Sequence, residues 1–191
     1  MTGVQTCALP ISGNHDDPAL VHGHFPLEGR VDGDYRYVTE IGDLRLVACD
    51  STVAASEAGA FGSERLAWLE SLLDQDVDRP TIVAMHHPPI DIGIEALDEI
   101  RIADPDAAVL GESLASRPQV LRLICGHVHR AATGTIGGCQ IFACPSNHMA
   151  APLEIGVSGS PSDLELVAEP PAFAVHALLR GGGIVSHVQP I

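Results

Sequence analysis

The sequence predicts an α/β fold, a sandwich of two sheets flanked by helices. Its 191 residues suit one domain with its own hydrophobic core, and 46% of them are hydrophobic against 18% charged. Short apolar runs rich in Val, Ile and Leu alternate with segments of helical periodicity, and the chain ends in strand-like runs alone. These runs are all too short to cross a bilayer.

Strands are expected wherever a short apolar run is bounded by turn residues. Residues 35–50 are typical of a hairpin that turns near Gly42 and Asp43. The buried strand at 79–89 must stop at Pro88 and Pro89, because proline lacks the N–H that a sheet needs. Further strands are expected at 120–130, at 134–146 and at 173–191, the last as a hairpin.

Helices are expected between these strands. Residues 62–75 give the clearest pattern, with Ser63 placed to cap the first turn and one apolar face, formed by Leu66, Leu69, Leu72 and Leu73 with Trp68 beside them. Residues 104–118 predict a second helix with a proline in its first turn. Residues 147–172 are rich in Pro, Ser and Gly and predict a long surface loop.

Charge and cysteine content narrow the choice of partner and compartment. The net charge is −15, from 10 basic and 25 acidic residues, which argues against a nucleic-acid polymer or an anionic membrane as partner. A small anion could still bind at a local cationic centre, most simply at metal ions. The five cysteines have no zinc-ligand spacing, and Cys49 and Cys125 lie in apolar runs. Reduced, packed thiols and the lack of a visible signal peptide predict a cytoplasmic protein.

Histidines and amides follow three buried strands, where ligands bind in α/β sheets. They are Asn14 with His15, His86 with His87, and His127 with His129, all neutral ligands suited to zinc, iron or manganese. His127 and His129 are two apart in what we expect to be an extended segment, so both should point to the same side. A single histidine at a strand end is more often a hydrogen-bonded surface residue, but three such sets in order predict one shared metal centre.

The motifs "GNHDD" (13–17), "MHHPPI" (85–90) and "CGHVHR" (125–130) resemble those of the calcineurin-like metallophosphoesterases. Within that superfamily the chain is most similar to the bacterial class III cyclic-nucleotide phosphodiesterase and glycerophosphodiesterase branch. The resemblance implies the metallophosphatase-type α/β-β/α sandwich of two mixed sheets flanked by helices.

The resemblance also implies two divalent metal ions (Fe, Mn or Zn). Asn14, His86 and His127 would ligate one ion, and His129 would ligate the other. In the family pattern the first histidine of the pair binds metal, so His87 is interpreted as a structural residue next to the ligands.

Two further residues would act in catalysis. His15 would face the phosphate and the leaving oxygen, and Asp16 would hold its imidazole in the useful tautomer. Asn147 and His148 follow the last metal-binding strand, so His148 is a candidate substrate contact. The alternative is that Asn147 and His148 are an ordinary hydrogen-bonded loop pair.

The same family pattern requires an Asp-x-His and a Gly-Asp upstream of Asn14, and residues 1–12 contain no Asp, Glu or His. We therefore expect 1–12 to be a non-native leader in which "ALPIS" imitates a strand, with the first βαβ units missing. Residues 13–146 would be the C-terminal part of the metallophosphoesterase core. Residues 147–191 would be a loop and terminal hairpin that complete the second sheet, cap the site or form a homodimer contact. Such a fragment should bind one metal ion weakly.

The predicted function is hydrolysis of a small phosphodiester by a metal-activated hydroxide, with a 3′,5′-cyclic nucleotide ahead of a glycerophosphodiester. This chain itself would be an impaired fragment of that enzyme. Three alternatives remain open: a phosphomonoesterase of the same fold, a non-catalytic scaffold, and a mononuclear zinc hydrolase with Asp16 or Asp17 as base.

Overall fold

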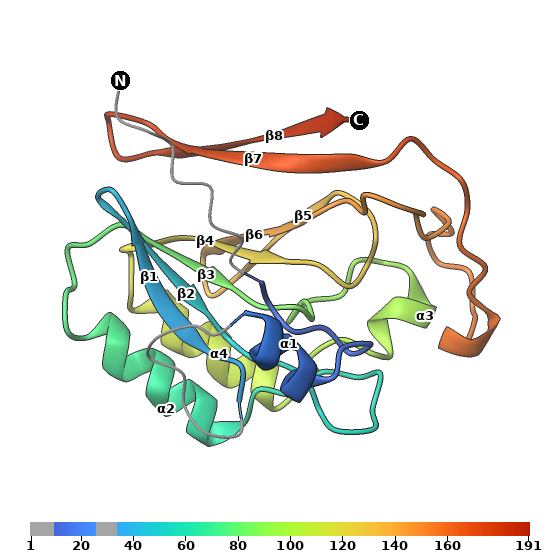
Figure 1. Ribbon diagram of the computed structural model, residues 1–191, viewed down its shortest axis with the longest axis horizontal. Coiled ribbons are helices and arrows are strands. Elements are labelled where there is room, and N and C mark those ends of the chain that lie inside the picture. The colour runs from blue at the N-terminus through green and yellow to red at the C-terminus, as the bar shows by residue number, and fades with distance from the viewer. Residues whose placement is uncertain (1–9, 26–33) are drawn as a thin grey trace.

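The computed structural model of the chain describes residues 10–25 and 34–191, and its largest element is a six-stranded sheet (Figure 1). The strand order is β1-β2-β3-β4-β6-β5. The four inner strands are parallel, and the two edge strands β1 and β5 are antiparallel to their neighbours. The strands are β1 (Tyr37–Ile41), β2 (Leu44–Ala48), β3 (Thr81–Ala84), β4 (Val120–Cys125), β5 (Ala132–Ile136) and β6 (Cys139–Ala143).

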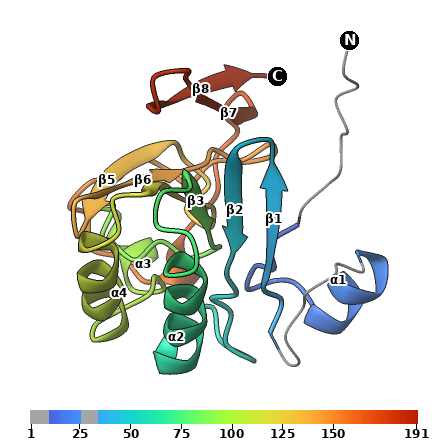
Figure 2. The ribbon, with the colours of Figure 1, turned by 90° about the vertical axis from the view of Figure 1, so that its left-hand side faces the viewer.

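Two helices, α2 (Gly62–Leu73) and α4 (Asp106–Ala115), cover one face of this sheet (Figure 2). They bury their apolar side chains against those of the inner strands; fully buried members of this core are Val47, Leu69, Leu73, Val83, Leu110 and Leu123. Burying one such side chain contributes about 1.5–3 kcal/mol, so this interface holds the parallel strands rigid. The carboxyl ends of β3 and β4 are thereby fixed side by side.

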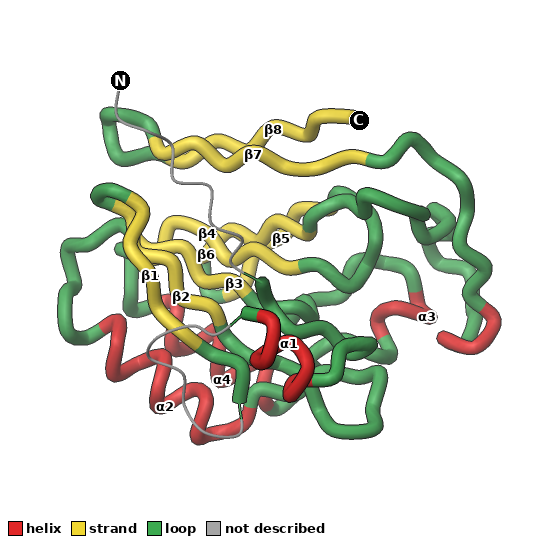
Figure 3. The backbone as a smooth tube through the Cα atoms, in the orientation of Figure 1, coloured by secondary structure: helices red, strands yellow, loops and turns green. Residues whose placement is uncertain are grey.

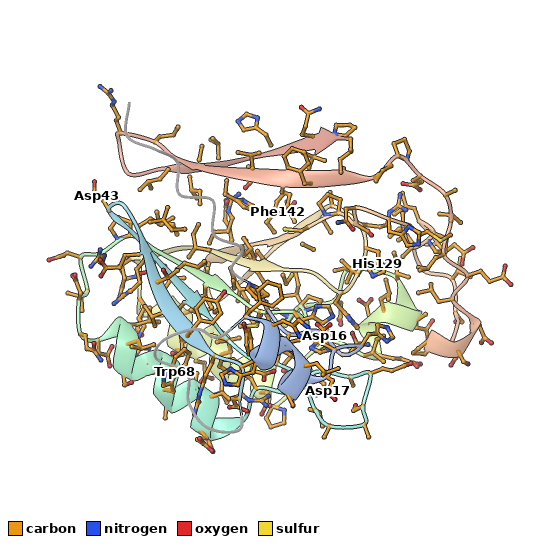
Figure 4. The ribbon with its side chains drawn as sticks, viewed as in Figure 1. Asp16, Asp17, Asp43, Trp68, His129 and Phe142 are labelled. Carbon is orange, nitrogen blue, oxygen red and sulfur yellow. The ribbon has the colours of Figure 1, made fainter. Side chains whose placement is uncertain are left out.

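A second, two-stranded sheet of β7 (Ala172–Leu178) and β8 (Ile184–Pro190) lies over the opposite face. Arg122 of β4 reaches across, donating to Ser186 Oγ. The rings of Phe142 and His176 meet edge to face with centroids 5.1 Å apart, and Figure 4 labels Phe142 beneath the hairpin. The expected two-sheet sandwich is confirmed, but among the described residues no helix covers the outer face of β7 and β8.

The predicted hairpins and the first helix are confirmed. β1 and β2 turn at Gly42 and Asp43, and α2 ends at Leu73, two residues earlier than expected. The segment expected to form strands at 134–146 holds most of another hairpin: all of β6 and the end of β5, which begins two residues earlier at Ala132. Two short helices were not predicted: α1 (Pro18–His24) and α3 (Glu95–Asp98).

The predicted helix caps are wrong. Ser63 does not cap α2; the N-cap residue is Phe61, which makes no side-chain cap bond. Instead, Asp106 of α4 accepts hydrogen bonds from the N–H groups of Phe61 and Gly62, both at 2.7 Å. A carboxylate from the neighbouring helix thus satisfies two backbone donors at the start of α2. Pro105 precedes α4 as its N-cap residue instead of lying in its first turn.

The long loop between β6 and β7 is confirmed and is drawn in green in Figure 3, apart from one short helical turn in red. It contains one 3₁₀ turn, η1 (Pro161–Asp163), and an isolated bridge between Ala150 and Val167. At the other end of the chain, residues 10–12 form no strand, so "ALPIS" does not imitate one there, and positions 8 and 9 lie outside the described residues. None of the described helices is long and apolar enough to span a bilayer.

Candidate metal centre

Three of the predicted site residues converge at the carboxyl edge of the parallel strands. His86 follows β3 by two residues, His127 follows β4 by two, and Asn14 lies in the segment that leads into α1. The Oδ1 atom of Asn14 lies 2.9 Å from Nε2 of His86, and that nitrogen lies 3.3 Å from Nδ1 of His127. Possible metal-ligand atoms thus meet although Asn14 and His86 are 72 positions apart in the chain and His86 and His127 are 41 apart.

These separations fit a metal ion. For metal–nitrogen bonds of about 2.0–2.1 Å, neighbouring ligand atoms lie about 3.4 Å apart around a tetrahedral ion and about 3.0 Å apart around an octahedral one. Asn14 Oδ1 and His127 Nδ1 both lie at such separations from Nε2 of His86. Within the described part of the chain, buried Nε2 of His127 and Nδ1 of His129 have no hydrogen-bond partner. Unsatisfied buried polar atoms are uncommon in proteins and often mark a missing ion or water.

His87 lies in the same cluster, and its nitrogen comes within 4.8 Å of those of His86 and His127. Its ring nitrogens are already occupied, however. Nε2 lies 3.1 Å from the carbonyl oxygen of Glu57, which can only accept, so Nε2 carries the proton. Nδ1 lies 2.9 Å from the hydroxyl of Ser51 and accepts from it. With no free lone pair on its ring, His87 supports its neighbours by packing, which agrees with the structural role expected for it.

Burial keeps the clustered imidazoles neutral. Burial first, and then repulsion between neighbouring histidines, lower the pKa of both His86 and His127 to about 3. The pKa of His87 falls to about 4, again chiefly because the ring is buried. Neutral imidazole is the form that binds metal, so at neutral pH these rings are ready to accept a cation.

Two glycines give the cluster the space that it needs. A Cβ atom on Gly13 would lie 2.8 Å from Cε1 of His86, and one on Gly59 would lie 2.4 Å from Cγ of His87. Ordinary contacts of this kind begin at about 3.4 Å, so any larger residue would push these rings away. Gly13, the glycine of "GNHDD", thus acts through close packing, a role that was not predicted from the sequence.

The turn that carries His127 and His129 differs from the extended segment that was expected. Both residues adopt a left-handed backbone conformation, with φ of 66° and 53°. This conformation is uncommon for residues other than glycine and occurs often at functional sites. The turn begins because β4 ends at Cys125, after which Val128 N–H donates to the carbonyl of Gly126 at 2.7 Å. Figure 4 labels His129 on this turn.

The predicted catalytic residues are only partly brought together. His15 is exposed and lines the same pocket as Asn14 and His86. The Asp16 carboxylate, however, accepts from Gly13 N–H at 2.8 Å, and in the described hydrogen bonds it does not contact the His15 ring. Asp16 therefore closes a turn at the start of α1, near its label in Figure 4, instead of orienting an imidazole.

His148 is also displaced from the expected place. It is exposed, and it lines a neighbouring cavity of about 270 Å³ that shares His129 but not the other predicted ligands. Its backbone N–H donates to Ser146 Oγ at 3.0 Å, as in an ordinary loop. This hydrogen bond fits the alternative of a hydrogen-bonded loop pair, and a substrate contact by the His148 side chain stays a prediction.

The pocket beside the ligand cluster has a volume of about 210 Å³. Besides Asn14, His15, His86, His127 and His129, it is lined by Glu57, Leu97, Ile100, Ala151, Pro161, Leu164 and Leu166. The last seven were not predicted, because they come from loops and short helical turns whose position depends on contacts with distant segments. The ligand cluster and a mostly apolar set of side chains thus line one cavity.

The calcineurin-like phosphoesterase family matches residues 5–131, two thirds of the chain and the whole stretch that supplies the ligand cluster. The chain belongs to this family. The match covers all three histidine-bearing motifs, so the resemblance inferred from them is confirmed.

Relatives of this calcineurin-like protein carry phosphodiesterase names. A probable glycerophosphodiester phosphodiesterase of Arcobacter nitrofigilis is 30% identical over 95% of this chain and 66% of its own length. The 3′,5′-cyclic adenosine monophosphate phosphodiesterase of Pseudomonas aeruginosa is 28% identical over 71% of this chain and 47% of its own. A dimetal phosphatase structure from Danio rerio has 21% identity and a TM-score of 0.45, covering 60% of this chain and 50% of its own. The chain spans 44–66% of the length of three phosphodiesterase relatives that it matches.

Proposed function

We propose that this protein takes part in metal-dependent hydrolysis of a small phosphodiester. The observation that carries the proposal is the convergence of Asn14 Oδ1, His86 Nε2 and His127 Nδ1 at 2.9 and 3.3 Å, beside an open pocket. A set of neutral nitrogen and amide donors next to a cavity suits a divalent cation that holds an anion.

Asn14, His86 and His127 would hold one divalent ion, and His129, with its unpartnered Nδ1, would contribute to a second. When bound, such ions supply a nucleophilic hydroxide at neutral pH and neutralise the phosphoryl oxygens. Iron, manganese and zinc all suit these donors.

The residues of the chain then have distinct tasks. His87, hydrogen-bonded to Ser51 and Glu57, packs against His127 with ring centroids 4.5 Å apart and fixes its orientation. His15 is exposed at the pocket and free to turn toward a leaving oxygen, to which its imidazolium would give a proton.

Cyclic nucleotides are the first substrates to test, with glycerophosphodiesters second. The support is that relatives carry both names, with a cyclic adenosine monophosphate phosphodiesterase and a glycerophosphodiester phosphodiesterase among them. A phosphomonoesterase and a non-catalytic scaffold remain the alternatives, because the metal centre alone does not select the ester.

The decisive experiment measures metal binding and hydrolysis together. The purified chain is titrated with Mn²⁺, Zn²⁺ and Fe²⁺ and assayed on cyclic AMP, glycerophosphocholine and a phosphomonoester. His127→Ala should weaken metal binding at least tenfold and abolish the metal-dependent activity, since it removes one ligand of the set. His187→Ala, on exposed strand β8, is the matched control and should change neither.

Each outcome narrows the candidates. Metal binding without hydrolysis of any ester would fit both the scaffold and the impaired fragment expected from the sequence, and hydrolysis of only the monoester would favour the phosphomonoesterase. Equal metal binding by His127→Ala and the unmodified chain would refute the proposed centre.

The cellular compartment and the oligomeric state of the protein are proposed from other features of the chain. The cysteines that the structure describes, Cys49, Cys125, Cys139 and Cys144, are unpaired. Unpaired thiols support a reducing compartment, such as the cytoplasm. A homodimer through residues 147–191 is a further proposal, which the mass of the protein in solution would test.

A further inference from the structure

The pocket next to the ligand cluster has one polar side and one apolar side. The apolar side, which we call the apolar wall, consists of Leu97, Ile100, Ala151, Pro161, Leu164 and Leu166. Leu97 and Ile100 come from α3 and the residues just after it, whereas the other four come from the loop between β6 and β7. The loop therefore has a specific place in the site instead of being only a connection.

The apolar wall is held in place from the metal-binding turn itself. Arg130, the residue after His129, pairs with both carboxylate oxygens of Glu169 at 2.9 and 3.2 Å and donates to the carbonyl of Ala151. A bidentate pair of this kind fixes direction as well as distance. Two backbone hydrogen bonds between Ala150 and Val167, at 3.0 and 2.8 Å, close the loop behind it.

The charge around the pocket restricts what the apolar wall can bind. Among the described residues that line the pocket there is no arginine or lysine, and Glu57 is its one carboxylate. A negative group on the organic part of a substrate would find no arginine or lysine there to pair with. Apolar contact is the attraction that the apolar wall offers, worth about 0.8 kcal/mol for each buried CH₂ group.

We propose that the apolar wall binds the organic group of the phosphodiester and selects substrates in which this group is uncharged and largely apolar. The proposal rests on the proposed function, because the phosphate must sit at the adjacent metal centre. The pocket has a volume of about 210 Å³, which is below the roughly 300–1,000 Å³ of drug-sized pockets. It therefore accommodates one small organic group.

The test compares binding of two simple diesters to the Mn²⁺-loaded chain by calorimetry. Dibutyl phosphate should bind about tenfold more tightly than dimethyl phosphate, since one butyl chain adds three methylenes at about fourfold each before losses in chain entropy. The double variant Leu164→Asn, Leu166→Asn should bring the two affinities within about twofold. Leu153 is 66% exposed on the same loop and does not line the pocket. The control variant Leu153→Asn should therefore keep the preference for dibutyl phosphate.

Two additions sharpen the test. Glu169→Gln should reduce the preference for dibutyl phosphate without touching the apolar wall, because Arg130 loses its bidentate partner. Cyclic AMP identifies the natural source of the organic group. If the double variant weakens cyclic AMP as much as dibutyl phosphate, the purine occupies the apolar wall; if not, an alkyl ester does.

Thermal unfolding of each variant shows that it has folded. Equal binding of the two diesters by the unmodified chain, or an unchanged preference in a folded double variant, would overturn the proposal. If the unmodified chain prefers dibutyl phosphate but hydrolyses none of the esters, the proposed function is overturned and the binding role of the apolar wall is retained.

Discussion

Replacing Gly13 with alanine tests the close packing on which the metal centre depends. The new Cβ atom would lie 2.8 Å from Cε1 of His86, 3.0 Å from Nδ1 and 3.1 Å from Nε2. Gly13 has no positive φ, so the substitution acts through space alone and not through backbone strain. Relief of the contact requires the His86 ring to move.

The size of that movement can be worked out. Ordinary contact begins at 3.4 Å, so the ring must retreat by about 0.6 Å, well beyond the roughly 0.2 Å by which metal–ligand distances vary. Its Nε2 atom would then leave the separation of 2.9 Å from Asn14 Oδ1. Losses of about 10- to 100-fold in metal affinity follow when the support of a ligand is disturbed. We expect a loss in this range.

Calorimetric titration with Zn²⁺ or Mn²⁺ measures the effect, and circular dichroism confirms that the variant has folded. Gly23→Ala is the matched control, because a Cβ atom there meets nothing within 4 Å and the position is exposed on α1. It should leave metal affinity unchanged and stabilise the helix by up to about 1 kcal/mol. A folded Gly13→Ala variant that binds metal within twofold of the unmodified chain would refute the reasoning.

The remaining predictions concern stability. Burial lowers the folded pKa of His86 and His127 to about 3, below the unfolded value of about 6.5. Between these two pKa values the unfolded chain binds more protons than the folded chain. Urea unfolding of the metal-free protein should therefore give a free energy of unfolding that is lower by about 1–2 kcal/mol for each histidine at pH 5 than at pH 7. A free energy of unfolding that does not change between these pH values would contradict this. Arg45 is buried and donates to the carbonyls of Leu72 and Asp76, so Arg45→Ala should cost about 2–3 kcal/mol in the same assay. Arg79→Ala, which breaks a pair with an exposed carboxylate, should cost less than about 1 kcal/mol, and equal losses would count against the explanation.

Local periodicity accounts for what was predicted well. The hairpin at 35–50 and the helix from Gly62 follow from the spacing of apolar residues and from turn chemistry, both of which act over a few positions. The meeting of His86 and His127 could be predicted too, because buried strands end where polar residues begin and parallel strands share that edge. Asn14 follows no strand among the described residues, so its place beside them was implied by the family resemblance instead of by this rule.

What was missed depends on contacts between distant segments. Ser51 orients His87 from 36 residues away, and Asp106 caps α2 from 44 and 45 residues away. No local pattern encodes such a partner. The left-handed turn at His127 and His129 was misjudged because an apolar strand running into histidines looks extended until the strand's last residue is known.

The ligand atoms of the centre belong to parts of the chain that are far apart, with 72 positions between Asn14 and His86 alone. An ion that joined them would act as a cross-link closing a large loop, and such a link limits the conformations open to the denatured chain. Its binding energy would then be part of the folding energy of the whole sheet. Chelators should consequently loosen regions of the protein that never touch the ion, and hydrogen exchange across β3 and β4 would register the metal's departure.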